Sequence, residues 1–594
     1  MVKEKWIIYG KKADFNRLSS VYKISPIVAR IIRNRNIIDD KDFDMYLNGT
    51  IDFINSPFLF KDMDKAVDIL LNAVEENKKI RVIGDYDIDG ICSTYILTKG
   101  IELIGGNVSM DIPDRVKDGY GINENIIKKA YEDKVGLIIT CDNGIAAIEE
   151  IKLAKSLGIT VIVTDHHNVP FEEINGEKIY KRVIADATVN QKQPDCKYPF
   201  KELCGGGIAY RFMIAVAMTL QKLSDDRANK IYTFEEEMIV FAAIATIGDV
   251  VSLTGENRII AKTGLKLIKS TSNIGLKALI EKCELRDSKI SSFHIGFIIG
   301  PCLNATGRLD TAKMGYELLN CDDMKMAEKL AMELVELNNI RKNLTKTGEI
   351  IAEKLALEYE NDKVLVLYIE KIHESIAGII AGRIREKFNK PTIILTYGEN
   401  MVKGSGRSIE GYDMYAGINK CSHLLERFGG HTMAAGVSLK EENIDEFRNQ
   451  LNDNCILKDE DFVRRVWIDV PVPIGYINDE LVEELYKLEP FGKDNEKPIF
   501  ALKNVKILKF YLIGTNKNMA KIILEDGGYS ITATLFNRLE EFLELISKKY
   551  GEDMMRRLKM GLTTDIEASF TYYPVINEYK GNRSLQINIT GFMI

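Results

Sequence analysis

The chain has 594 residues, of which 45% are hydrophobic and 28% are charged, and its formal net charge is −7. This length predicts several domains of ordinary soluble composition, while the acidic balance excludes a protein coated in nucleic-acid-binding surface but not one with a narrow basic groove. Nine cysteines without CxxC pairs indicate reduced thiols in a cytoplasmic protein. The start, Met1–Trp6, lacks a secretory signal, and the longest apolar stretch, Met238–Ile247, is too short to span a membrane.

Residues 1–45 predict a short helical arm. Apolar residues recur at helical spacing from Leu18 to Arg35, and the basic run Arg30–Arg35 is typical of a solvated helix face. We expect the first large domain to occupy residues 46–310.

Three carboxylates, Asp85, Asp87 and Asp89, follow a short apolar run at every second residue. Anions this close repel one another unless a cation neutralises them, so the spacing favours a metal site over a solvated turn. Two more apolar runs, Leu137–Thr140 and Val161–Thr164, end in the same way. Asp142 follows the first run, and His166 and His167 follow the second.

Helix-like segments at residues 122–132 and 146–157 separate these runs, which predicts a parallel sheet with its site at the carboxyl ends of the strands. A buried helix over Phe234–Ile247 then leads to Asp249. The candidate catalytic set is Asp85, Asp87, Asp89, Asp142, His166, His167 and Asp249. Of these, the predicted metal ligands are Asp85, Asp87, Asp89, Asp142, His166 and Asp249.

This ligand set is hard, with no thiolate, and favours two Mn²⁺ or Mg²⁺ ions over a structural zinc. A pair of such cations suits hydrolysis of a phosphoester.

The remainder of the chain predicts three further regions. Residues 311–358 read as a connecting helix without proline, and residues 359–456 as a second α/β domain, with strands at 364–369 and 392–396 around a helix at 375–388. Residues 457–594 alternate apolar and polar positions, which predicts a small β-barrel. Its expected strands are 504–510, 519–524, 530–536, 566–573 and 585–589.

Aromatic and lysine side chains alternate within the barrel segment. Phe510, Tyr511, Tyr529 and Tyr572 either stack nucleic-acid bases or fill the barrel, and Lys506, Lys509, Lys517 and Lys521 are placed to follow phosphates. The sequence leaves the two alternatives for the aromatics open.

Gly84-Asp-Tyr-Asp-Ile-Asp-Gly90 with Thr164-Asp-His-His167 resembles the DHH phosphoesterase superfamily, and within it the RecJ family of exonucleases. The likeness extends from about residue 50 to 500, through Ile112–Arg115, Gly248–Val251, Gly300–Arg308, Gly404–Ser408, Phe428–His431 and Pro490–Gly492. Departures from the family pattern at Cys302, Ser375, Gly406 and Asp494 concern details of DNA contact and remove no predicted ligand.

The resemblance implies an α/β multidomain enzyme with a parallel-sheet DHH domain, a DHH-associated domain and a C-terminal OB-fold. Its implied activity is 5′-to-3′ degradation of single-stranded DNA to 5′-mononucleotides in DNA repair and recombination. The implied partners are a DNA 5′ end, single-strand-binding protein and a RecQ-type helicase, and the implied state is a monomer.

The resemblance also implies site residues in the second half of the chain. Arg115, Ser405 and Arg407 would hold the terminal 5′-phosphate, and Arg308 and His431 would act near the scissile phosphate. His373 is a further candidate for substrate binding, whereas His423 reads as structural.

Two alternatives remain. A small-oligonucleotide or cyclic-dinucleotide phosphodiesterase would carry the same metal motifs, but such proteins usually stop after the second domain. A noncatalytic DNA-binding scaffold would be expected to have lost ligands, yet every expected ligand is present.

Overall fold

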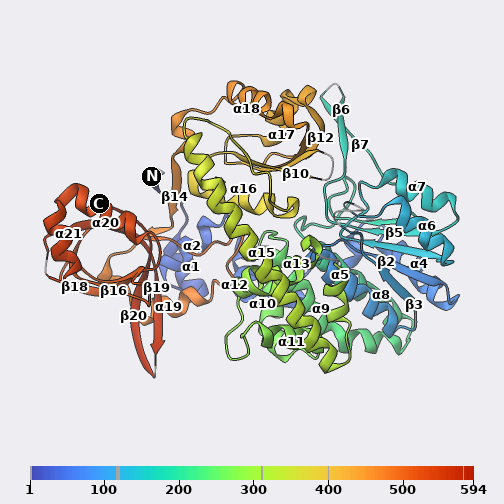
Figure 1. Ribbon diagram of the computed structural model, residues 1–594. Helices are drawn as coiled ribbons and strands as arrows, with labels where there is room; N and C mark the ends of the chain where they lie inside the picture. The colour runs from blue at the N-terminus through green and yellow to red at the C-terminus, as the bar shows by residue number, and fades with distance from the viewer. Residues whose placement is uncertain are drawn as a thin grey trace. The chain divides into compact units, whose positions relative to one another are not determined.

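The computed structural model describes residues 3–114, 119, 121–174, 176–309, 312–398, 401–562, 564–579 and 581–594. The chain forms two compact units (Figure 1). The first unit comprises Met1–Lys3 and Thr50–Arg464, and the second comprises Glu4–Gly49 and Arg465–Ile594.

A parallel sheet begins the first unit, with strand order β3-β2-β4-β5-β8. Its core strands are almost wholly buried, as expected for a parallel sheet covered by helices on both faces. The strands are β2 (Lys79–Ile83), β3 (Asn107–Asp111), β4 (Leu137–Cys141), β5 (Thr160–Thr164) and β8 (Ala187–Val189). The associated helices are α4 (Met63–Glu75), α5 (Ile88–Leu103), α6 (Glu124–Glu132) and α7 (Ile148–Ser156). An exposed hairpin, β6 (Phe171–Ile174) with β7 (Glu177–Tyr180), follows β5.

A layer of helices follows the sheet and includes the expected buried helix before Asp249. That helix is α9, and its buried residues extend around its whole circumference, which is typical of a helix enclosed by others. The layer consists of α8 (Gly205–Lys222), α9 (Arg227–Gly248), α10 (Gly255–Leu267), α11 (Ile274–Lys282), α12 (Ser292–His294), the π-helix η4 (Ile295–Ile299) and α13 (Gly300–Leu309).

The expected connecting helix is divided in two. α14 (Lys313–Leu319) ends at Asn320, and α15 (Met324–Glu358) begins after Asp323, whose carboxylate caps the new helix by accepting the Met326 N–H. Because the Asp323 carboxylate satisfies a backbone N–H at the start of α15, it favours a new helix here, although helix propensity alone predicts one continuous helix.

The second sheet of this unit has strand order β12-β13-β11-β10-β9, and β9 and β10 run parallel while the other pairs are antiparallel. Its strands are β9 (Leu365–Tyr368), β10 (Thr392–Tyr397), β11 (Val402–Arg407), β12 (Leu425–His431) and β13 (Ala434–Leu439). Its helices are α16 (Glu374–Phe388), α17 (Met414–Lys420) and α18 (Ile444–Asp453). Short 3₁₀ turns in the first unit are η1 (Ile51–Phe53), η2 (Pro57–Leu59), η3 (Ile268–Ser270), η5 (Ser422–Leu424), η6 (Glu441–Asn443) and η7 (Asp459–Phe462).

The second unit is a barrel that shares its core with the N-terminal helices. The strand order β15-β16-β17-β18-β20-β19 closes through β16–β19 pairing, which confirms the predicted barrel. Its elements after the N-terminal segment are β14 (Arg464–Ile468), β15 (Val470–Pro471), η8 (Ile474–Tyr476), α19 (Asp479–Tyr486), β16 (Phe500–Ile513), β17 (Met519–Asp526), β18 (Tyr529–Leu535), α20 (Leu539–Tyr550), α21 (Glu552–Lys559), β19 (Glu567–Tyr579) and β20 (Asn582–Met593).

The N-terminal segment contributes β1 (Glu4–Ile8), α1 (Phe15–Tyr22), α2 (Pro26–Asn34) and α3 (Asp40–Asn48). Leu18, Val28 and Phe43 lie in one buried cluster with barrel residues such as Phe510 and Tyr572. The predicted helical arm is therefore an integral part of this unit.

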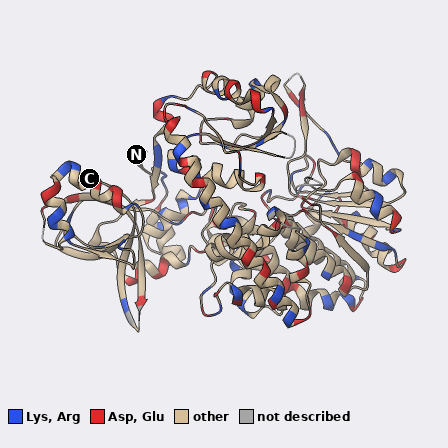
Figure 2. Cartoon of the chain, viewed as in Figure 1, with Lys and Arg blue, Asp and Glu red and all other residues tan. Residues whose placement is uncertain are grey.

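Charged residues of both signs are interspersed along the helices of the first unit (Figure 2). Among the helices in the described part of the chain, none has both the length and the apolar character required to cross a lipid bilayer.

Candidate metal centre and phosphate pocket

The acidic and imidazole side chains meet because their strands are neighbours. β2, β4 and β5 lie side by side in parallel, so the residues that follow them emerge at one edge of the sheet. Asp142 has a left-handed backbone conformation, with φ of 60°, directly after β4. Asp249 reaches the same place from the C-terminal cap of α9.

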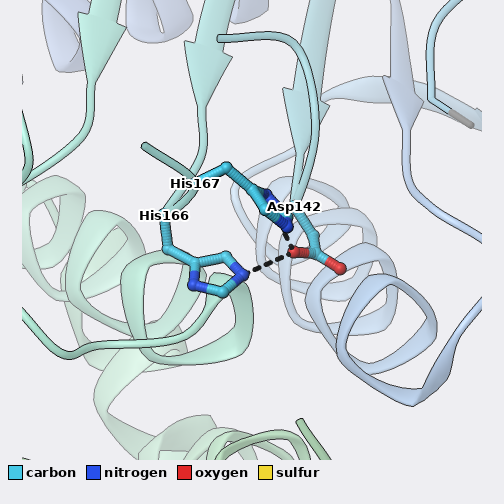
Figure 3. A group of neighbouring side chains, drawn as sticks. All are labelled: Asp142, His166 and His167. Atoms are coloured by element: carbon cyan, nitrogen blue, oxygen red, sulfur yellow. Dashed lines mark ion pairs between the residues drawn. The ribbon is translucent and has the colours of Figure 1, made fainter. Parts of the chain in front are cut away.

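His166 lies at the centre of the group. Its Nε2 is 3.0 Å from an oxygen of Asp142, 3.6 Å from Asp89 and 3.7 Å from Asp249. His167 Nδ1 is 3.9 Å from the same Asp142 oxygen, and Figure 3 shows both imidazoles directed toward that carboxylate.

Three overlapping triads in the described residues bring potential ligand atoms within 4.8 Å of one another. They are Asp85–Asp87–Asp142, Asp142–His166–His167 and Asp89–His166–Asp249. Because Asp142 and His166 each belong to two triads, the arrangement offers adjacent places for two cations. It brings together all seven residues of the predicted catalytic set.

The electrostatics of the group fit divalent cations. Burial, reinforced by neighbouring aspartates, raises the pKa of Asp85 and Asp142 well above the ordinary value and that of Asp249 to about 8. Asp85 Oδ1 is buried and makes no hydrogen bond within the described residues. A hard divalent cation would stabilise the ionised form of these carboxylates and would provide the buried Asp85 oxygen with a partner.

The two histidines differ in charge. Burial lowers the pKa of His166 to about 4, which leaves its ring neutral and able to donate a lone pair. Burial alone would lower the pKa of His167 as well, but the hydrogen bond and charge of Asp165 raise it to about 9. A protonated His167 therefore donates its Nδ1–H to Asp165 Oδ1 across 2.8 Å.

Asp165 is absent from the predicted set, although it lies within the Thr164–His167 motif. Its two oxygens accept backbone N–H groups from Ile145 and His166 at 2.9 and 2.7 Å, in addition to the His167 ring. Asp165 thus orients both histidines. The only sequence signal for this role is the position of Asp165 directly after a strand and before the two histidines.

Asp89 has a supporting arrangement of its own. Its oxygens accept the N–H groups of Gly205 and Gly206, both at 2.7 Å, at the start of α8. A Cβ on Gly205 would lie 2.7 Å from that of Asp142, so only glycine permits this approach. The sequence motifs did not reveal this glycine pair.

Asp87 of the first motif is held by the start of a helix. Asp87 caps α5 by accepting the N–H groups of Asp89 and Gly90. Asn304 of α13 accepts the Ile88 N–H at 2.8 Å and so joins α13 to the same turn. Asn304 is a further site residue that the prediction missed.

Arg308 lines two cavities within the first unit. One, of about 290 Å³, also contains Asp85, Asp87 and Asn304. The other, of about 540 Å³, extends onto the second sheet and contains Ser405, Arg407 and Arg427. Arg308 Nη1 donates to the Ser375 carbonyl at 2.6 Å, which ties α13 to the start of α16.

The larger cavity has the polar groups that a phosphate requires. Arg407 Nη1 donates to Ser405 Oγ at 3.0 Å and to the Gly406 carbonyl at 2.8 Å. Gly378 of α16 packs against both side chains, since a Cβ there would lie 2.8 Å from Arg407 Nη2 and from Ser405 Oγ. The Arg407 guanidinium is therefore held at the cavity wall by these hydrogen bonds and by the close approach of the α16 backbone at Gly378.

The structure does not place every predicted residue in these cavities. His373 caps α16 through its Nδ1, which accepts the Ser375 N–H, and His431 is exposed at the end of β12. Neither His373 nor His431 lines either of these two cavities. Arg115 lies outside the described residues, and His423 is exposed near Gln450.

Fold and site together define a phosphoesterase of the DHH type with an associated second domain and an OB-fold. The family models that match are "DHH family, N-terminal domain" at residues 79–246, "DHHA1 domain" at 361–456 and "RecJ OB domain" at 468–591.

Known relatives make the assignment more specific. The chain is 32% identical to the single-stranded-DNA-specific exonuclease RecJ of Haemophilus influenzae, over 95% of each protein. It is 34% identical to the RecJ of Bacillus subtilis over 91% of this chain and 66% of that one. The chain therefore belongs to the RecJ family.

A solved structure agrees in fold. RecJ of Thermus thermophilus in complex with Mn²⁺ matches with a TM-score of 0.80 and 24% identity, over 100% of this chain and 80% of that one.

Proposed function

We propose that this protein is a single-strand-specific 5′-to-3′ exodeoxyribonuclease that hydrolyses phosphodiesters with two divalent cations and releases 5′-mononucleotides. The observation that carries the proposal is the pair of cavities that share Arg308, with Asp85 and Asp87 of the acidic cluster lining one and Ser405 and Arg407 lining the other. Family membership supports it, since the relatives are named as exonucleases specific for single-stranded DNA.

Asp85, Asp87, Asp142, His166 and Asp249 are the residues we propose to hold Mn²⁺ or Mg²⁺, with Asp89 at the edge of the set. Cations there would activate a water molecule and neutralise charge that develops on the phosphate. Asp165 holds His167 by a charged hydrogen bond, which leaves an imidazolium beside the carboxylates to counter that charge. Asp89, with both oxygens occupied by backbone N–H groups, positions its neighbours.

The phosphate pocket explains the proposed polarity. Arg407 and Ser405 would bind the terminal 5′-phosphate, so that end enters first and the next phosphodiester faces the carboxylates. Arg308, which lines both cavities, is placed to contact the scissile phosphate. Arg115, His373 and His431 remain proposals that rest on the family resemblance alone.

The barrel is the proposed platform for the single strand. Tyr511 and Tyr529 are 44% and 61% exposed and are available for stacking, whereas Phe510 and Tyr572 are fully buried and fill the barrel. We therefore propose base stacking for the two exposed tyrosines and a packing role for the two buried aromatics. Lys506, Lys509, Lys517 and Lys521 are all exposed and suited to phosphates.

A DHH phosphodiesterase acting on cyclic dinucleotides or short oligonucleotides is the second candidate, favoured only by the shared acidic cluster. The complete barrel at residues 468–591 argues for a longer substrate. We further propose a cytoplasmic monomer that acts in DNA repair and recombination and receives its substrate from single-strand-binding protein and a RecQ-type helicase.

The test is digestion of end-labelled DNA, single-stranded and duplex, with Mn²⁺, Mg²⁺ or EDTA. We expect 5′-labelled single strands to release labelled mononucleotide at once, 3′-labelled strands to shorten from the far end, and EDTA and Asp142→Asn to stop both. Digestion from the 3′ end, equal cleavage of duplex, or faster hydrolysis of a cyclic dinucleotide would contradict the proposal.

A further inference from the structure

Two cysteines on different helices of the first unit lie in contact. Cys283 is the C-terminal cap of α11, Cys302 lies in α13, and their sulfurs are 3.9 Å apart. Cys302 is 2% exposed, whereas Cys283 is one of the cysteines partly open to solvent. One thiol is therefore accessible to a small oxidant while the other lies directly behind it.

Several donors surround the sulfur of Cys302. Cys283 and Cys302 share a sulfur–sulfur contact in which either thiol can be the donor, and Asn338 Nδ2 donates to the Cys302 sulfur at 3.3 Å. The contact with Cys283, together with Asn338 and the charges of Lys342 and Arg341, lowers the pKa of the Cys302 thiol, whereas the same contact and burial raise the pKa of the Cys283 thiol. A thiol with a lowered pKa provides more thiolate, which is the form that attacks an oxidised sulfur.

We propose that Cys283 and Cys302 form an oxidation site at which a hydroperoxide closes a disulfide between α11 and α13. Cys283 passes its proton to the Cys302 thiolate in contact with it as its sulfur attacks one oxygen of hydrogen peroxide. The hydroxide that is released takes this proton back from Cys302 and leaves as water, so Cys283 becomes a sulfenic acid and Cys302 is again a thiolate. The Cys302 thiolate then attacks the Cys283 sulfur and expels hydroxide, which takes up the proton that Cys302 lost. In sum, two thiols and one peroxide give one disulfide and two waters.

Closing the disulfide would disturb the contacts that α13 makes at Cys302. Its formation requires the two sulfurs to approach from 3.9 Å to about 2.05 Å. The movement also removes the Cys302 sulfur from Asn338, which in turn holds Arg341 through its Oδ1 at 2.9 Å. α13 carries Asn304 and Arg308, which line the same cavity as Asp85 and Asp87.

Hydrolysis should therefore be slower in the oxidised protein. A displacement of about 1 Å in a positioning group can cost up to roughly a hundredfold in rate, so we expect a loss of about tenfold or more. This consequence rests on the proposed function, whereas the disulfide itself does not.

The experiment treats the full chain, with Mg²⁺ present, with hydrogen peroxide, and then alkylates the remaining thiols and digests the protein for mass spectrometry. We expect a peptide pair joined through Cys283 and Cys302, lighter by two hydrogen atoms, that separates on addition of dithiothreitol. Cys321, the other partly exposed cysteine, provides the matched control, because Cys321→Ser should leave the crosslink intact while Cys283→Ser and Cys302→Ser abolish it.

Oxidation of Cys283 to sulfinic or sulfonic acid with Cys302 still reduced would overturn the proposed site. Cleavage of single-stranded DNA measured on the same samples tests the coupling: the wild-type rate should fall and recover with reductant, and the Cys283→Ser rate should not fall. An equal loss in Cys283→Ser, or a crosslinked protein of unchanged rate, would overturn the coupling. A reduced wild-type protein that cleaves nothing would instead refute the proposed function.

Discussion

Removal of divalent cations should make the first unit less stable as the pH rises from 6.5 to 8. In the metal-free protein the folded-state pKa of Asp249 is about 8, against an ordinary value of 3.8, because burial and the neighbouring aspartates oppose its ionisation. The folded state then binds more protons than the unfolded state across this interval, so the free energy of unfolding falls as pH increases. The stability is present below about pH 4 and lost as pH rises through about 8.

The size of the effect follows from the shift. Each pH unit below the folded pKa corresponds to about 1.4 kcal/mol, so Asp249 alone contributes a loss of roughly 2 kcal/mol between pH 6.5 and 8. His167, whose pKa is raised to about 9 by Asp165, changes stability in the same direction over this interval. Bound Mg²⁺ or Mn²⁺ should remove most of the loss, since the ionised carboxylates are its ligands.

The assay compares thermal unfolding with EDTA and with Mg²⁺ at several pH values. Both tryptophans, Trp6 and Trp467, belong to the second unit, so tryptophan fluorescence reports that unit while far-UV circular dichroism reports both. We expect the fluorescence midpoint to be insensitive to the cation and the transition of the first unit to fall by several degrees at high pH only in EDTA. The substitution Asp249→Asn should reduce the slope of stability against pH, because it removes the titrating carboxyl group.

A metal-free first unit whose stability is constant or increases from pH 6.5 to 8 would refute this reasoning. So would an equal cation effect on the fluorescence transition, because no predicted ligand lies in the second unit.

Asp142→Asn should lower the rate of hydrolysis by at least a hundredfold, about 3 kcal/mol in the barrier, because Asp142 belongs to two ligand triads. Circular dichroism should show an intact fold, and a variant that keeps more than a tenth of the wild-type rate would contradict the assignment of Asp142 as a ligand. Arg407→Ala should reduce the preference for a 5′-phosphate over a 5′-hydroxyl by roughly tenfold or more, because it removes a charged contact worth about 1.5–3 kcal/mol. The control Arg383→Ala, which removes an arginine of α16 paired with Glu349, should leave that preference unchanged. An equal loss of rate on both substrates for Arg407→Ala would argue against end recognition. Gly378→Ala should reproduce part of the Arg407 effect, since its Cβ would displace the guanidinium, and an unchanged phosphate preference would show that the cavity tolerates the methyl group. The double variant Tyr511→Ala/Tyr529→Ala should weaken binding of long single strands by about tenfold, measured by fluorescence anisotropy, whereas Phe510→Ala should instead lower the unfolding temperature. An unchanged affinity of the double variant would exclude these tyrosines as a stacking platform.

The sequence alone determined the class of fold and the central chemistry. Asp85, Asp142 and His166 each follow an apolar run, and because parallel strands place their carboxyl ends at one edge, the spacing alone indicated that they would meet. The barrel was equally apparent, since its alternation has the two-residue period that only a strand with two unlike faces requires.

Only the tertiary structure decided which groups support that chemistry. Asp165 contacts its close neighbour His167, but the sequence did not distinguish this supporting role from that of a metal ligand. The Gly205–Gly206 N–H pair and Asn304 act through contacts with segments more than a hundred residues away, and no local pattern records such contacts. The same holds for Phe510 and Tyr572, which alternate like Tyr511 but point into the barrel, and for the N-terminal helices, whose apolar faces required a partner that lies more than four hundred residues away. Local residue type determines periodicity and charge, whereas burial and pairing depend on which distant surface covers each side chain.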